Sequence, residues 1–216
     1  MLKYVIWALI GYLSGSVMYS YLIPLWVKKI DVRQNSADHN PGAGNAFKNA
    51  GRALGLLSLM FDILKGLLPI LFSIQYLDVD NILFALVLCA PVIGHAFPFF
   101  GQWIKGGKGI AVSFGCFAGI IGTGAFLPFC VLTVYYTLFS KLIISHSHRV
   151  GSILLYAVFA VVMLLLPDPL SIKIGSFIIS LIIILKHWND GTTITDSTKE
   201  NPNYFYDIRV PRNTIG

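Results

Sequence analysis

The chain has 216 residues, of which 56% are hydrophobic and 12% are charged, and its mean hydropathy is +0.72. A water-soluble domain of this size does not need so much apolar surface, and several apolar stretches approach the ~20 residues that span a lipid bilayer. The net charge of +6 is explained by basic cytoplasmic loops, so we do not expect a nucleic-acid partner. Because the backbone in lipid must be hydrogen-bonded within its own segment, and alternating strand patterns are absent, we predict an all-α integral membrane protein.

The apolar stretches predict a polytopic bundle of about seven transmembrane helices. Their approximate bounds are 2–26, 53–76, 82–100, 109–123, 125–144, 151–167 and 171–187. The first stretch is long for a signal-peptide core and is expected to be retained as a span. Residues 1–187 are therefore predicted to form a single transmembrane domain, followed by a polar cytoplasmic tail over 188–216.

The connections between these spans alternate in charge. Lysines and arginines gather in the segments 27–52, 101–108 and 141–150 and in the C-terminal tail, whereas the other connections hold Asp78, Asp80 and Asp168. Basic loops stay in the cytoplasm, so the N-terminus is predicted outside and the C-terminus inside. No internal repeat is visible, which disfavours a transporter built from duplicated halves.

The segment 105–109 reads Lys-Gly-Gly-Lys-Gly and separates two apolar spans. It is not a P-loop, because Gln102 lies where the first glycine of that motif should be and Gly109 follows the lysine. Bare glycine amides, two cationic side chains and the N-terminal end of the next helix nevertheless favour an anion. The alternative is a tight turn that carries cytoplasmic lysines.

The first basic connection contains Arg33 and the turn Asn40-Pro41-Gly42. Arg33 is a candidate for bidentate phosphate binding, and the alternative for the whole loop is an ordinary surface turn. Ser16 lies inside the first span, where its hydroxyl either bonds its own helix or holds a phosphate or a reacting oxygen.

Ionisable residues also occur inside the predicted spans. Asp62 and Lys65 are three residues apart on one helix face, so they can neutralise one another as a structural ion pair or serve a substrate or proton path. His95 is expected to be a hydrogen-bonded structural group, whereas His187 ends the last span and is either structural or an anion donor. The cysteines, all in apolar stretches, indicate no disulfide, and no metal site is expected.

These motifs occur together in one order. Gly-Ser at 15–16 precedes Asp-x-Arg at 31–33 and an Asn-x-Gly-Ala-x-Asn loop at 40–45; Asp-x-x-Lys-Gly at 62–66, Gly-His-x-Phe-Pro at 94–98, the 105–109 loop and a terminal Lys-His pair at 186–187 follow. The set resembles the PlsY family, bacterial acyl-phosphate:glycerol-3-phosphate acyltransferases. The match is good over residues 11–115 and looser beyond.

The resemblance implies seven spans, an external N-terminus and an active site on the cytoplasmic face of the bacterial plasma membrane. It implies acyl transfer from acyl phosphate to glycerol 3-phosphate without a cofactor or metal. The other expected partners are membrane lipids and the enzyme that supplies acyl phosphate. The catalytic candidates are Ser16, Arg33, Lys108 and His187, and the phosphate-binding candidates are Lys105, Gly106, Gly107, Gly109, Asn40 and Asn45.

The sequence departs from the family pattern at three places and reads as a divergent branch. The usual Gly-Ser-Ile-Pro reads Gly-Ser-Val-Met at 15–18. The usual Gly-Ser-Gly-Asn after Asp-x-Arg is replaced by residues 36–40, with one extra residue. The last motif carries Asp190 where the family has asparagine, and its later glutamate is not recognisable. The altered last motif leaves open a non-catalytic member of the family. The cationic loops and the Asp62 and Lys65 pair also suit a second alternative, a small transporter or flippase for an anionic solute or lipid.

Overall fold

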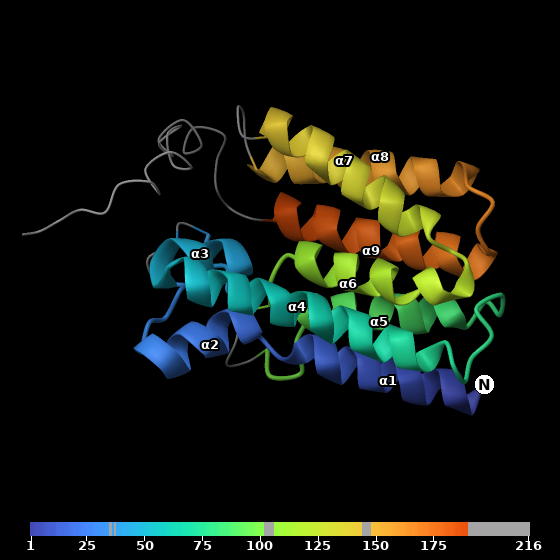
Figure 1. Cartoon of the computed structure of the whole chain (residues 1–216), viewed down its shortest axis with the longest axis horizontal. Coiled ribbons are helices and arrows are strands. Elements are labelled where there is room, and N and C mark those ends of the chain that lie inside the picture. The colour runs from blue at the N-terminus through green and yellow to red at the C-terminus, as the bar shows by residue number, and fades with distance from the viewer. Residues whose placement is uncertain (35, 37, 102–105, 144–147, 190–216) are drawn as a thin grey trace, which may run out of the picture.

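The computed structural model describes all residues except 35, 37, 102–105, 144–147 and 190–216. All regular secondary structure in those residues is helical, as predicted (Figure 1). The elements in chain order are α1 (Leu2–Ser16), α2 (Tyr19–Lys28), α3 (Ala43–Ala50), α4 (Arg52–Ser73), α5 (Phe84–Ala96), α6 (Ile110–Gly119), the 3-10 turn η1 (Ile121–Thr123), α7 (Leu127–Ile143), α8 (His148–Leu165) and α9 (Leu170–Trp188).

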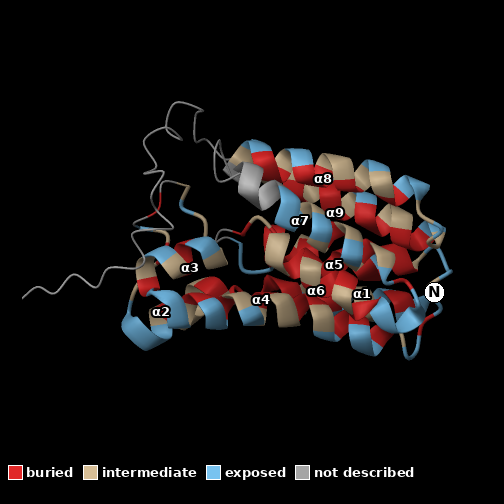
Figure 2. Cartoon of the chain, turned by 45° about the horizontal axis from the view of Figure 1, so that its top comes forward, coloured by how far each residue is buried: buried red, intermediate tan, exposed pale blue. Residues whose placement is uncertain are grey.

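The outer surface of the bundle is apolar. On α1, large side chains such as Val5 and Leu9 are exposed, whereas Tyr4, Gly11 and Gly15 on the opposite face are buried (Figure 2). Three segments are long and apolar enough to cross a membrane, namely Leu2–Lys28, Arg52–Ser73 and Leu170–Trp188. Shorter apolar helices make up most of the rest of the bundle. Exposed apolar side chains on such helices are what a lipid-facing surface requires.

The expected first span, 2–26, corresponds to the apolar segment Leu2–Lys28, which is long enough to cross a membrane but consists of two helices. The chain leaves the helix at Val17, which is extended with φ −75° and ψ 117°, and re-enters it at Tyr19. The following connection also holds a helix that the sequence did not predict, α3, between Ala43 and Ala50. The fourth expected span, 109–123, contains only a short helix, because α6 has 10 residues, or about 15 Å of helix.

Helix α5 forms the centre of the bundle. All of its 13 residues are buried except Leu86 and Ile93, and it packs against α1 on one side and α9 on another. Helix α4 packs on α6, and α8 covers α9. The core therefore lies around α5. Gly106 and Gly107 lie against the C-terminal end of this helix.

Glycines allow α1 and α5 to approach closely. A Cβ atom added at Gly94 would overlap the carbonyl oxygen of Tyr12, and one added at Gly15 would overlap the carbonyl oxygen of Pro91. Small residues at helix contacts serve this purpose in membrane bundles, where dispersion contacts replace the hydrophobic effect as the force between helices.

Gly94→Ala is expected to destabilise the fold by about 1–3 kcal/mol, because α1 and α5 would have to separate. The measurement is the unfolding transition of the purified protein in detergent. Gly122→Ala is the control, since its new methyl group meets only the flexible Cδ1 of Ile74 at 3.4 Å. Equal stability of the two variants would contradict the close approach.

Candidate functional site

The predicted pair Asp62 and Lys65 is an ion pair buried in the bundle. Lys65 Nζ lies 2.8 Å from Asp62 Oδ1, and both side chains are no more than 2% exposed. Ser20 Oγ donates to the other carboxylate oxygen, Asp62 Oδ2, at 2.5 Å. The two residues that the sequence placed on one helix face therefore lie in contact in the core.

Lys65 also joins three elements. Its Nζ donates to the carbonyl oxygen of Val17 at 2.7 Å and lies 2.8 Å from His95 Nδ1. The Val17 carbonyl is where the chain leaves α1, and a carbonyl freed by a helix end needs such a partner inside a membrane. The network therefore fixes the break between α1 and α2 against α4 and the end of α5.

The glycine loop lies directly on the end of α5. The Gly107 N–H donates to the carbonyl oxygen of His95 at 3.0 Å, and a Cβ on Gly107 would overlap the His95 ring. A Cβ on Gly106 would overlap the carbonyl oxygen of Ala96. The glycines are thus required by packing, and the Gly107 amide already has a protein acceptor. Gly109 has φ +88° and forms the N-cap of α6, while Lys105 lies outside the described residues.

Lys108 is paired with a carboxylate from the first basic loop. Its Nζ donates to Asp38 Oδ2 at 2.8 Å, and Asp38 Oδ1 accepts from Asn45 Nδ2 at 2.9 Å and from the Asn40 N–H at 3.1 Å. Burial alone raises the pKa of Asp38, but the Lys108 ammonium and the donors outweigh it and lower that pKa to about 2. Three predicted site residues, Asn40, Asn45 and Lys108, therefore converge on one anionic group.

A cavity of about 250 Å³ opens beside this cluster. It is lined by Asp38, Asn40, Phe97, Gly106, Lys108, Leu185, Lys186 and Asn189. Lys186, whose Nζ donates to the carbonyl oxygen of Ala96 at 3.0 Å, was not a candidate from the sequence, and neither was Asp38. The available signal for Asp38 was an acidic residue next to the Asn40-Pro41-Gly42 turn in a basic loop.

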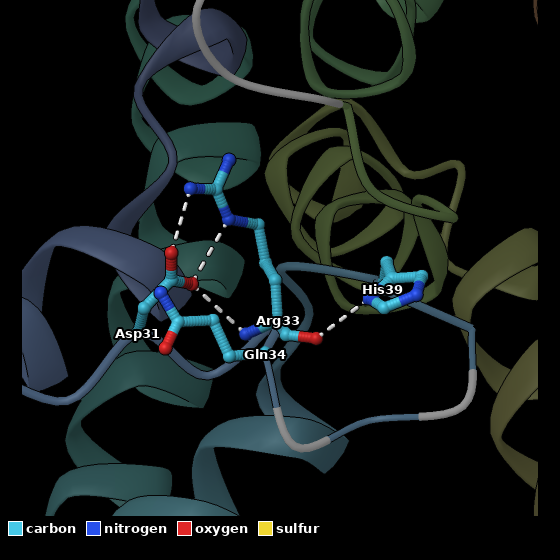
Figure 3. A pocket seen from close by; sticks show the side chains of 4 residues that line it. All are labelled: Asp31, Arg33, Gln34 and His39. Carbon is cyan, nitrogen blue, oxygen red and sulfur yellow. Dashed lines mark hydrogen bonds and ion pairs between the residues drawn. The ribbon is translucent and has the colours of Figure 1, made fainter.

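Arg33 lines a different, open depression of about 530 Å³ (Figure 3). Its Nε and Nη2 donate to the two oxygens of Asp31 at 2.9 and 2.8 Å, and its guanidinium lies 4.3 Å from the centre of the Tyr21 ring. The hydrogen bonds between the two groups lower the pKa of Asp31 and raise that of Arg33. His39 Nδ1 lies 2.9 Å from the Arg33 carbonyl oxygen, so the same loop carries both pockets.

The last two catalytic candidates are buried. Ser16 Oγ donates to the Tyr12 carbonyl oxygen at 2.8 Å, which is the helix-bonding alternative, and accepts from the Phe99 N–H at 3.2 Å. His187 Nδ1 lies 2.8 Å from the Ile183 carbonyl oxygen. Since a carbonyl only accepts, Nδ1 carries the proton there and Nε2 of the neutral ring has the lone pair. Neither side chain lines the cavity, although Lys186 and Asn189 flank His187 in sequence and do.

Comparison with known proteins gives consistent matches. A family profile described as glycerol-3-phosphate acyltransferase matches residues 5–196. The chain is 38% identical over 152 residues to "Glycerol-3-phosphate acyltransferase 2" of Thermotoga maritima, covering 68% of this chain and 76% of that one. It is 31% identical over 190 residues to the protein named glycerol-3-phosphate acyltransferase of Syntrophotalea carbinolica, covering 87% and 91%.

The fold is also shared with a solved structure. The glycerol 3-phosphate form of PlsY, an integral membrane glycerol 3-phosphate acyltransferase, superposes with a TM-score of 0.70 at 24% identity, covering 86% of this chain and 88% of that one. The lysophosphatidic acid form gives a TM-score of 0.69. The all-helical arrangement described above is thus the fold of that protein, which is described as an integral membrane enzyme.

Lys65→Met is expected to destabilise the protein by about 3–5 kcal/mol, because it leaves the Asp62 carboxylate buried and uncompensated. The double variant Asp62→Asn with Lys65→Met is expected to recover most of that loss, since no charge is left in the core. Thermal unfolding in detergent measures both. A single variant as stable as the parent would show that the pair does not hold the fold.

Proposed function

The chain belongs to the glycerol-3-phosphate acyltransferase family, and we propose that it transfers a fatty acyl group from acyl phosphate to glycerol 3-phosphate in phospholipid biosynthesis. The products are 1-acyl-glycerol 3-phosphate and phosphate. The observation that supports this most is the convergence of Lys108, Asn40 and Asn45 beside one cavity. Both substrates carry phosphate, and these donors are of the kind that hold it.

The cavity also has an apolar side suited to an acyl chain. Phe97 and Leu185 line it together with Lys108, and they are 56% and 47% exposed. An acyl chain can therefore lie against lipid-facing surface while its phosphate reaches the cationic group. The glycerol 3-phosphate phosphate is assigned to Arg33 and His187, with Ser16 helping to orient the reacting groups. Because Arg33 lines the neighbouring depression and the other two side chains are buried, this assignment requires a rearrangement when the substrate binds.

In the proposed reaction, a glycerol hydroxyl oxygen attacks the acyl carbonyl carbon. The bond from that carbon to the phosphate oxygen breaks, phosphate leaves with the electron pair, and the hydroxyl proton passes to a substrate phosphate or to His187 Nε2. Acyl phosphate is already activated, so no covalent enzyme intermediate is needed. Holding the two substrates together can supply up to ~7–11 kcal/mol of the rate enhancement, and cations near the developing charge add to it.

The proposed topology has seven spans in the bacterial plasma membrane, an external N-terminus and a cytoplasmic site. It is supported by the basic residues Lys28, Arg33, Lys108 and Lys186 at the site end and by Asp78, Asp80 and Asp168 in the opposite connections. Residues 1–187 are proposed as one acyltransferase domain and 188–216 as a cytoplasmic tail. The proposed partners beyond the substrates are membrane lipids and the enzyme that supplies acyl phosphate.

A transporter is less well supported. It would need charges along a path through the bundle, but the buried charges of Asp62 and Lys65 are satisfied by each other, by Ser20 and by the Val17 carbonyl. A non-catalytic family member stays an outcome of the assay, because the residues after His187 depart from the family pattern.

Lys108→Ala is expected to lower the formation of 1-acyl-glycerol 3-phosphate by at least about 100-fold, because the phosphate loses its cationic partner. Purified protein is assayed with acyl phosphate and radiolabelled glycerol 3-phosphate. Lys48→Ala, on the exposed face of α3, is the matched control and is expected to retain activity.

Two results of that assay would contradict the proposal. Full activity of the Lys108→Ala variant would show that Lys108 does not bind the substrate phosphate. Absence of turnover by the parent protein would show that it does not catalyse this reaction. Binding of glycerol 3-phosphate by a parent without turnover would favour the non-catalytic alternative.

The topology predicts opposite labelling of two exposed positions. With Cys89, Cys116 and Cys130 replaced by alanine, Asp80→Cys is expected to react with a membrane-impermeant maleimide in intact bacteria. Lys48→Cys is expected to react only after permeabilisation. The reverse pattern would place the site outside.

A further inference from the structure

We propose that Asp38 occupies the phosphate site of the empty protein and that a substrate phosphate must displace it to bind. Asp38 is then an affinity-determining residue: it competes with the ligand within the same chain. The proposal depends on the proposed function only for the identity of the anion as phosphate, and it makes a prediction about binding that needs no turnover.

The geometry of Asp38 is that of a bound oxyanion. Its Oδ2 lies 2.8 Å from Lys108 Nζ, and its Oδ1 accepts from Asn45 Nδ2 at 2.9 Å and from the Asn40 N–H at 3.1 Å. Two oxygens of one acid thus take an ammonium, an amide and a backbone donor from two separate segments of the chain. A phosphate uses the same kinds of donor.

The contact between Asp38 and Lys108 is accessible, unlike the pair in the core. The side chains of Asp38 and Lys108 are 19% and 22% exposed, and both line the cavity. The Asp62 and Lys65 side chains are 2% and 1% exposed at the same 2.8 Å separation. An incoming anion can therefore reach the first pair, whereas the second pair is sealed.

Displacement needs only a local change in the loop. The Asp38 side chain and the Asn40 N–H form a turn around His39, which has φ +48° in the left-handed region. Residues other than glycine are uncommon there, so the loop holds the carboxylate in place at some conformational cost. Rotation of the Asp38 side chain away from Lys108 breaks its contacts with all three donors together.

Electrostatics requires the exchange. With its pKa lowered to about 2, Asp38 is ionised at neutral pH, so it is a competing anion and not a useful proton acceptor. A phosphate beside an undisplaced carboxylate would meet a like charge within a few ångströms. The competition weakens ground-state binding, which aids release of the phosphate product without lowering the intrinsic rate of the chemical step.

The test is Asp38→Asn, which removes the charge but keeps an oxygen for the Asn40 and Asn45 donors. Calorimetric titration of the full-length protein in detergent with inorganic phosphate is expected to show a Kd lowered by about tenfold. The KM for the substrate that uses this site should fall, with kcat changed much less. Asp80→Asn removes the same charge at an exposed position and is expected to leave the Kd unchanged.

A second pair of variants separates competition from a structural role. In a Lys108→Ala background, Asp38→Asn is expected to give no tightening, because the cation for which carboxylate and phosphate compete is absent. Tightening that persists there, or a Kd for phosphate that is unchanged or raised in folded Asp38→Asn, would overturn the proposal. If Asp38→Asn does not fold, the same titration is made with Asp38→Ser.

These outcomes are independent of those for the proposed function. If Asp38→Asn binds phosphate more tightly but the parent transfers no acyl group, the competition by Asp38 is supported and the proposed acyltransferase activity is rejected. Acyl transfer by the parent with unchanged phosphate binding in Asp38→Asn would do the opposite.

Discussion

The rest of the structure depends on the contacts of the buried Lys65 ammonium. A charge inside a bundle surrounded by lipid must be compensated, and here Asp62, the Val17 carbonyl and His95 surround it. The carbonyl comes from the interruption between α1 and α2, so the pair stabilises that break. His95 in turn lies against Gly107, so the position of the glycine loop depends on a buried charge one helix away.

The glycine loop shows how packing and chemistry can require the same residues for different reasons. A side chain at position 106 or 107 would overlap the end of α5, and the Gly107 N–H is held by the His95 carbonyl oxygen. The glycines therefore fix where Lys108 lies relative to the end of α5. The proposed phosphate-binding role depends more on Lys108 and the neighbouring asparagines than on the Gly107 amide. The short helices α5 and α6 place this loop beside the end of α9.

The local parts of this arrangement could be predicted from the sequence, whereas the distant pairings could not. Asp62 and Lys65 lie three residues apart on one helix, so periodicity alone brings them together. The helix break at Val17 and the helix α3 depend on partners from other elements, which propensity does not reveal. Asp38 and Lys108 are 70 residues apart, so local pattern cannot pair them. Arg33 lies outside the Lys108 cavity because of the path of the loop that carries it, which the sequence pattern does not reveal either.

Two ion pairs of equal length thus have opposite consequences because their surroundings differ. The pair in the core is cut off from water and exchanges with nothing, since removal of either charge leaves the other without compensation. The pair at the cavity is partly solvated, so the carboxylate can be replaced by another anion at little desolvation cost. A protein that must bind a phosphate, and then release one, needs the first kind of pair in its scaffold and the second kind in its site.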